Sequence, residues 1–120
     1  MKDSLQPGIE RTASYKVTAD MAPGHLPVAV LSTPSMISLI EGTCLAAAAE
    51  HLDAGETSVG THVCVSHSGA AMENEEVSVH VRLKEIQKRR LTFDIEVRSP
   101  RAQISEGTHQ RAVIDASRFG

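Results

Sequence analysis

Only one segment of this 120-residue chain repeats its apolar residues with the period of an α-helix. This segment spans residues 33–52, contains four consecutive alanines and is followed by Asp-Ala-Gly. We predict Thr33 as its N-cap and Pro34 as its first helical residue, because a proline there lacks only an amide hydrogen that has no intrahelical partner. Gly42 costs about 1 kcal/mol relative to alanine inside a helix, so we expect another backbone to approach it. The apolar positions follow the helical period at 36, 37, 40, 44, 45, 48 and 52.

The rest of the chain alternates with the period of β-strands. A weak first strand at 9–18 precedes a proline-containing loop at 19–32, and four further strands follow the helix at 59–67, 77–86, 91–97 and 103–115. In the strand at 59–67 we expect the odd-numbered residues to share one face, and in the next two strands the apolar residues to point inward. One long helix with about five mainly antiparallel strands predicts an α+β fold in which a curved sheet wraps the helix. Such a sheet has exposed edges, and a small chain commonly covers them by forming a homodimer.

Length and composition exclude several classes of protein. The chain is expected to form one domain over residues 1–120, with 1–8 as a flexible N-terminal tail. A net charge of -3 with one Tyr, two Phe and no Trp argues against nucleic acid as a partner. No apolar stretch approaches the length of a membrane span, and the N-terminus lacks the apolar region of a signal peptide. Cys44 and Cys64 are too few for a disulfide framework, so we expect a cytoplasmic protein. The six histidines form no HxxxH or HExxH pair, and we predict no metal site.

Three blocks of sequence point to a known family. They are TPSMISLIE at 33–41, GETSVGTHVCVSH at 55–67 and EGTHQRAVID at 106–115. Their order and spacing resemble the hotdog-fold acyl-CoA thioesterases, most closely the fluoroacetyl-CoA thioesterase-like group, over nearly the whole chain from Gly8 to Phe119. The resemblance implies a hotdog fold, a thioester hydrolase that acts on acyl-CoA, and a homodimer or a higher homo-oligomer. It implies no cofactor, since CoA enters only as part of the substrate.

The resemblance also implies which residues form the site. Thr33, Glu41 and His67 match the catalytic positions of the family, which converge at the dimer interface, and Gly60 and Arg111 match positions that shape the substrate pocket. The chain departs from the family pattern in two loops. Residues 68–77 read SGAAMENEEV, so they lack the Thr-Pro and the glycine of the family pattern there, and Gly69 directly after Ser68 is their single glycine. Residues 22–32 lack the phenylalanine lid associated with selectivity for fluorinated substrates. We therefore expect an acyl group other than fluoroacetyl.

The chemistry of thioester hydrolysis suits these residue types. A carboxylate such as Glu41 can act as a general base on water or as a nucleophile on the acyl carbon, and the sequence leaves both routes open. An imidazole such as His67 can transfer a proton to the departing thiol, while Thr33 orients the water or the carboxylate. We expect the first-turn amides of Ser35 and Met36 to be free to stabilise an oxyanion. Arg111 or another surface cation would meet the phosphates of CoA.

Each candidate residue also has an ordinary structural explanation. Thr33 alone would be an N-cap, Glu41 a solvated helix residue, and His67 a hydrogen-bonded residue at a strand end. The function best supported is hydrolysis of a small to medium acyl-CoA thioester, with an aliphatic acyl group because the chain has few aromatic residues. The alternative is a non-catalytic hotdog module that binds an acyl thioester or a small hydrophobic ligand. Hydratase or dehydratase chemistry on the same fold is a third hypothesis.

Overall fold

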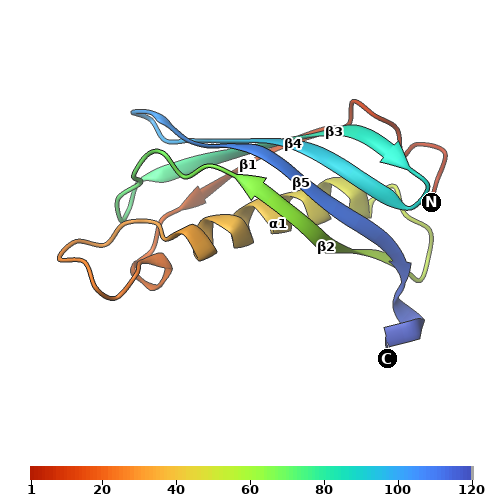
Figure 1. Ribbon diagram of the computed structural model, residues 1–120, viewed down its shortest axis with the longest axis horizontal. Helices are drawn as coiled ribbons and strands as arrows, with labels where there is room; N and C mark the ends of the chain where they lie inside the picture. Colours follow the sequence, from red (N-terminus) through yellow and green to blue (C-terminus); the bar gives the residue numbers. More distant parts are fainter. Residues whose placement is uncertain (120) are drawn as a thin grey trace.

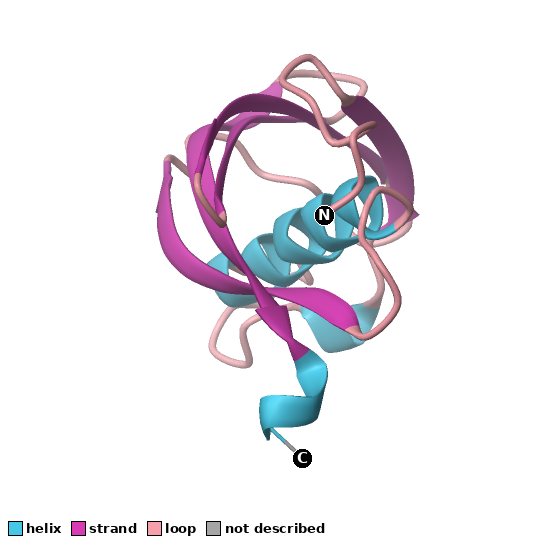
Figure 2. Cartoon of the chain, turned by 90° about the vertical axis from the view of Figure 1, so that its right-hand side faces the viewer, coloured by secondary structure: helices cyan, strands magenta, loops and turns pink. Residues whose placement is uncertain are grey.

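The computed structural model describes residues 1–119 and shows a curved antiparallel sheet wrapped around a single long helix, α1 (Figure 1). Seen end-on, α1 lies in the hollow of the sheet (Figure 2). The sheet order is β1-β3-β4-β5-β2, which leaves β1 and β2 at the edges. The predicted α+β architecture is confirmed. Its elements are β1 (Glu10–Lys16), a 3₁₀ turn (Ala19–Met21), α1 (Thr33–Ala49), β2 (Glu56–Val65), β3 (Glu76–Gln87), β4 (Arg90–Arg98), β5 (Gln103–Asp115) and a second 3₁₀ turn (Ala116–Phe119).

The core forms where α1 meets the concave face of β3 and β4. Alternate residues of both strands point inward, as their period-two pattern predicts. All eight of these side chains are buried, namely Val77, Val79, Val81, Leu83, Leu91, Phe93, Ile95 and Val97. From the helix, Met36, Ile40 and Cys44 are fully buried against them. Burying a large aliphatic or aromatic side chain contributes about 1.5–3 kcal/mol, so this layer fixes the rotation of α1 about its own axis.

The start of α1 differs by one residue from the sequence prediction. Ser32 is the N-cap, and its Oγ accepts a hydrogen bond from the Ser35 amide at 3.2 Å. Thr33 is therefore the first helical residue rather than the cap. Both serine and threonine are good caps, so the sequence alone does not separate them. The helix also ends earlier than predicted, at Ala49 with Glu50 as its C-cap. The shift at the start leaves the Thr33 hydroxyl free for another partner.

One apolar side chain of the helical pattern on α1 is exposed rather than buried. Leu45 is 39% exposed although its spacing matches that of the buried residues. A Cβ added to Gly42 would meet nothing within 4 Å, so no backbone of residues 1–119 approaches it. The predicted close approach at Gly42 is wrong within a single chain. Leu45 and Gly42 instead leave an open, partly apolar surface on the helix.

A β-bulge interrupts the alternation that we expected in β2. Gly60 pairs with Arg111, His62 pairs with Gln110, and Thr61 is the extra residue between them. The bulge shifts the inward positions of β2 by one residue. Val59 is therefore 39% exposed, whereas Val63 beyond the bulge is partly buried. The predicted single face of odd-numbered residues is wrong before the bulge and holds only after it.

Residues 1–8 contact strand β3 and the segment that follows α1. The side chain of Leu5 is buried, and the Gly8 amide donates to the Leu83 carbonyl at 2.7 Å. The Lys2 amide likewise donates to the His51 carbonyl at 2.9 Å. Among the helices of residues 1–119, none is long and apolar enough to cross a bilayer.

Replacing Gly107 tests the packing of β5 against β2. Gly107 has φ +152°, and an added Cβ would collide with the Cys64 carbonyl oxygen and lie 2.7 Å from the Val65 Cα. Since both neighbours are backbone atoms of a paired strand, we expect Gly107→Ala to lower the free energy of unfolding by about 2 kcal/mol or more. Urea unfolding followed by circular dichroism measures it. Gly24→Ala is the matched control, because nothing lies within 4 Å of that position; equal stability of the two variants would contradict the packing.

Candidate active site

The structure brings Thr33 and His67 into direct contact. The chain leaves β2 at Val65 and passes the start of α1, so that the Thr33 Oγ1 lies 2.7 Å from the His67 Nδ1. Because Ser32 caps the helix, the Thr33 hydroxyl is available for this bond. The sequence-predicted pairing of these two residues at one site is therefore present within a single chain. The bond occupies Nδ1 and leaves Nε2 of the imidazole for a second partner.

This pair borders a cavity of about 560 Å³ beside the start of α1. The loop before the helix contributes Leu26, Val30 and Leu31 to the wall, and the segment after β2 contributes Gly69 and Ala70. Among residues 1–119, no Phe, Tyr or Trp side chain lines this cavity. The wall is mostly apolar with a few polar groups at one end, which is the usual character of a small-molecule site.

Glu41 occupies a different place on α1. It lies eight residues after Thr33, which is about 12 Å along the helix axis, and it does not line the cavity. Its carboxylate instead lies over Gly60 of β2, because a Cβ added to that glycine would be only 2.6 Å from the Glu41 Oε1. Gly60 thus makes room for the partly buried carboxylate. Within one chain, Glu41 therefore lies apart from the Thr33–His67 pair.

The predicted oxyanion amides are not free. The Ser35 amide donates to the Ser32 Oγ at 3.2 Å, and the Met36 amide donates to the Ser32 carbonyl at 2.9 Å. The expectation that both amides were unpartnered is wrong, because the N-cap lies one residue earlier than predicted. Ser35 and Met36 lie close to Thr33 in the first turn, but their amide hydrogens are used by the helix start itself.

Arg111 lies inside the protein rather than at its surface. Its side chain is 5% exposed, and it donates from Nε to the Ser58 Oγ at 2.8 Å and from Nη2 to the Ser58 carbonyl at 2.9 Å. Its Nη1 lies 3.1 Å from the Nε2 of His109. Burial lowers the pKa of this guanidinium from its ordinary value. A guanidinium held in this way is not placed to meet the phosphates of CoA, which leaves that role to surface lysines and arginines.

His109 is a site residue that the sequence analysis did not assign. It is fully buried on β5, and its pKa is lowered mainly by burial and further by the charge of Arg111, against the opposing effects of its bond to the His62 carbonyl and of Glu41. The block EGTHQRAVID carried a signal for His109, because His109 and Arg111 are two residues apart and residues two apart on a strand share a face. Cys44 lies near the same cluster, where burial raises the pKa of its thiol to about 12.

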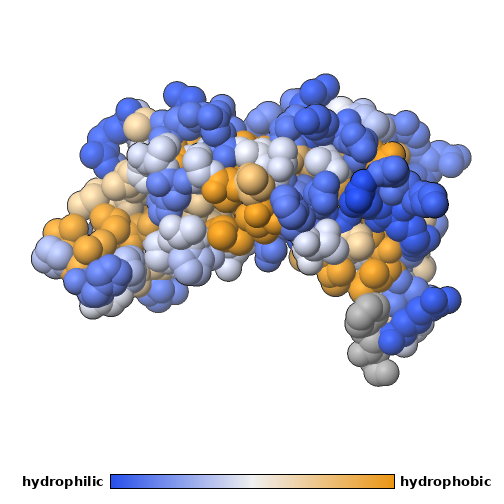
Figure 3. Space-filling view, viewed as in Figure 1, coloured by the Kyte–Doolittle hydropathy of each residue, from blue (hydrophilic) through white to orange (hydrophobic). Residues whose placement is uncertain are grey.

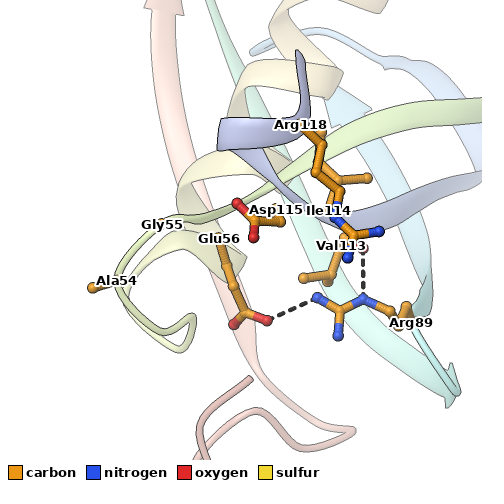
Figure 4. Close-up of a pocket in the computed structure, with 8 residues that line it drawn as sticks. All are labelled: Ala54, Gly55, Glu56, Arg89, Val113, Ile114, Asp115 and Arg118. Atoms are coloured by element: carbon orange, nitrogen blue, oxygen red, sulfur yellow. Dashed lines mark hydrogen bonds and ion pairs between the residues drawn. The ribbon is translucent and has the colours of Figure 1, made fainter. Parts of the chain in front are cut away.

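A larger cavity of about 750 Å³ lies near the C-terminal end of β5 (Figure 4). Arg89 lines this cavity. It donates from Nη2 to the Glu56 Oε2 at 2.8 Å and from Nε to the Val113 carbonyl at 2.9 Å. Asp115 and Arg118 complete its charged lining. None of the predicted site residues lines it. Within residues 1–119, no three His, Cys, Asp or Glu side chains lie close enough together to hold a metal ion.

Comparison with known proteins identifies relatives over the whole fold. The family model described as fluoroacetyl-CoA-specific thioesterase matches residues 12–117. The fluoroacetyl-CoA thioesterase of Streptantibioticus cattleyicolor is 33% identical over 128 residues, covering 99% of this chain and 92% of that protein. A solved structure of a fluoroacetyl-CoA thioesterase superposes with a TM-score of 0.92 at 30% identity, covering 98% of this chain and 93% of the other. A hot-dog-like protein from Thermanaerovibrio acidaminovorans, at 18% identity, superposes with a TM-score of 0.87 over 94% of this chain and 86% of the other. The predicted hotdog fold is confirmed.

Alanine substitutions at Ser32 and Thr33 separate capping from site formation. We expect Ser32→Ala to lower the free energy of unfolding by about 1 kcal/mol, because it removes the N-cap acceptor. Thr33→Ala leaves that cap intact and removes only an exposed hydrogen bond to His67, so it should cost less. Chemical denaturation of the two variants measures the difference. A larger loss for Thr33→Ala would show that Thr33 caps the helix after all.

Proposed function

Because the chain belongs to the fluoroacetyl-CoA-specific thioesterase family, we propose that it hydrolyses a small to medium acyl-CoA thioester to the free acid and CoA at a site shared by two subunits of a homodimer. The protein is a thioester hydrolase with a hotdog fold. The observation that carries the proposal is the 2.7 Å hydrogen bond between Thr33 and His67 at the end of an apolar cavity. Its two free cysteines suit a reducing compartment, and we place the protein in the cytoplasm.

The free edge of β2 supports the homodimer. The other edge strand, β1, carries Glu10, Arg11 and Lys16 among seven residues, and charged side chains on an edge disfavour pairing with another chain. From Thr57 to Val65, β2 carries no charged residue apart from histidine. Apolar surface gathers over β2 and β5 on this face of the molecule (Figure 3). Beside it, Leu45 and Val59 are each 39% exposed, and a second copy of the chain would cover both.

A two-fold axis would join the two halves of the site. In a two-fold dimer the same surfaces meet with the chains running in opposite directions. If the two α1 helices run antiparallel and the two-fold axis passes beside Ile37, Thr33 lies opposite Glu41 of the partner subunit. On β2, an antiparallel pairing centred between Val63 and Cys64 would bring Gly60, on the far side of the bulge, near His67 of the partner subunit, which follows the end of the strand. Both pairings place the Thr33–His67 pair of one subunit beside the carboxylate of the other, which is the arrangement that the reaction needs.

The chemistry then follows from the two half-sites. Hydrolysis adds water across the C–S bond, giving a carboxylic acid and the thiol of CoA. Glu41 acts on the acyl carbon either directly or through a water molecule, because a carboxylate can serve as nucleophile or as general base. The Nε2 of His67, which the bond to Thr33 leaves free, supplies the proton to the departing sulfur. The mostly apolar cavity, which no Phe, Tyr or Trp of residues 1–119 lines, accepts an aliphatic acyl group.

Replacement of Glu41 tests the assigned chemistry. We expect Glu41→Gln to lower kcat about 10²-fold or more on the best substrate, because it removes the proton acceptor or nucleophile while keeping the shape of the side chain. The measurement is release of free thiol from a panel of acyl-CoA esters of increasing chain length. Glu50→Gln, which changes an exposed glutamate at the helix end, is the control and should keep the native rate.

The same experiment separates an enzyme from a binding module. Equal rates for the native protein and Glu41→Gln would remove Glu41 from the mechanism. Saturable binding of acyl-CoA by the native protein, with no release of thiol from any ester of the panel, would contradict the enzymatic function and leave a binding protein.

Charge placed on the uncovered surface tests the homodimer. We expect the double variant Leu45→Lys, Val59→Lys to sediment as a monomer, because two ammonium groups would have to be desolvated in the interface. The native chain should sediment as a dimer or a larger assembly. Thr12→Lys, on the exposed edge of β1, is the control and should keep the native assembly. A native chain that sediments as a monomer at the concentration used for the assay would contradict the shared site.

A further inference from the structure

His109 has both of its ring nitrogens engaged inside the protein. The Nδ1 lies 2.8 Å from the His62 carbonyl oxygen, and since a carbonyl only accepts, Nδ1 carries the proton. The Nε2 then has a lone pair, which accepts from the Nη1 of Arg111 at 3.1 Å. The imidazole is 0% exposed. Because Nδ1 donates and Nε2 accepts, the ring is neutral and its tautomer is fixed. Burial also lowers its pKa from the ordinary value.

Arg111 supplies a buried positive charge behind this imidazole. Its three hydrogen bonds go to neutral acceptors, namely the hydroxyl and the carbonyl of Ser58 and the ring of His109. Across residues 1–119, no carboxylate lies within 4.0 Å of its guanidinium. A buried cation without an ion-pair partner favours negative charge in its surroundings. Cys44 remains a thiol because its pKa is about 12, which leaves Glu41 as the anionic group of this cluster.

The imidazole and the Glu41 carboxylate both lie beside the Cα of Gly60. A Cβ added to Gly60 would lie 2.6 Å from the Glu41 Oε1 and 3.2 Å from the His109 Cε1. The Cε1 carbon sits between the two ring nitrogens, and its hydrogen is a weak donor toward oxygen. The bulge beside Gly60 also provides the His62 carbonyl that anchors the ring. One irregular stretch of β2 therefore fixes the ring and leaves space for the carboxylate.

We propose that His109 is a positioning residue for Glu41. The fixed, neutral ring of His109 turns its edge toward the Glu41 carboxylate beside Gly60, and the charge of Arg111 lies behind the ring. His109 transfers no proton, because Nδ1 donates to His62 and Nε2 accepts from Arg111. It differs in this from His67, which is hydrogen-bonded through Nδ1 to Thr33 and borders the cavity. The inference rests on the proposed function, in which Glu41 acts on the acyl carbon or on a water molecule.

The test is a double-mutant cycle in the full-length protein. His109→Asn keeps an amide donor at the position of Nδ1, and so keeps the bond to the bulge, but it removes the ring edge and the acceptor for Arg111. We expect it to lower kcat about tenfold or more with KM changed less than about twofold, since an interaction that acts on the reacting carboxylate appears in kcat. In the Glu41→Gln background the same substitution should change the residual rate less than about twofold, because its effect passes through Glu41.

The outcomes separate this role from a purely structural one and from failure of the proposed function. An equal loss in both backgrounds, or a loss confined to KM, would overturn the positioning role while leaving Glu41 as the reacting group. A native rate for Glu41→Gln would overturn the proposed function, and the positioning role with it. His80→Asn, a partly exposed histidine on β3, is the control and should keep the native kcat.

A second measurement needs no substitution. In the native protein labelled with ¹⁵N-histidine, we expect His109 to keep a protonated Nδ1 and an unprotonated Nε2 from about pH 5 to about pH 8, whereas an ordinary histidine titrates in that range. A protonated Nε2 on His109 anywhere in this range would overturn the proposal, because the ring would then be unable to accept from Arg111.

Discussion

The packing of α1 into the concave face of the sheet is the constraint on which the rest of the molecule depends. Met36, Ile40 and Cys44 are buried against the inward residues of β3 and β4, and this contact fixes the rotation of the helix. With that rotation, the Thr33 hydroxyl points toward the chain leaving β2, and the Glu41 carboxylate lies over Gly60. The position of each reactive group is thus a consequence of apolar packing some distance from it.

The regular parts of the fold could be predicted from the sequence because they follow simple periods. The inward residues of β3 and β4 and the single long helix were predicted correctly. The bulge at Thr61 was not predicted, although Gly60 beside it is a residue type that often accompanies a bulge in a strand, and it reverses the inward face of β2 at Val59. The N-cap was wrong by one residue because Ser32 and Thr33 have similar capping ability. That single residue decides whether the Thr33 hydroxyl caps the helix or binds His67.

The candidate site was only partly accessible to sequence reasoning. Resemblance to a family gave Thr33, Glu41 and His67, but it gave neither the separation of Glu41 from the other two within one chain nor the burial of Arg111. His109 was missed although it lies two residues from Arg111 on the same strand, because that spacing alone does not show that the histidine is buried beside Glu41. Its importance appears only when its two hydrogen bonds and its place beside Gly60 are seen together.

The central claim is that each active site takes Glu41 from one subunit and the Thr33–His67 pair from the other, and mixing two inactive variants tests it directly. Glu41→Gln and His67→Gln chains would be unfolded together, refolded as a mixture, and assayed for thiol release from the best acyl-CoA substrate. If the site is shared, each mixed dimer has one intact site, and the mixture should recover roughly a quarter of the native activity by random pairing of two-fold dimers. A mixture no more active than either variant alone would contradict the account.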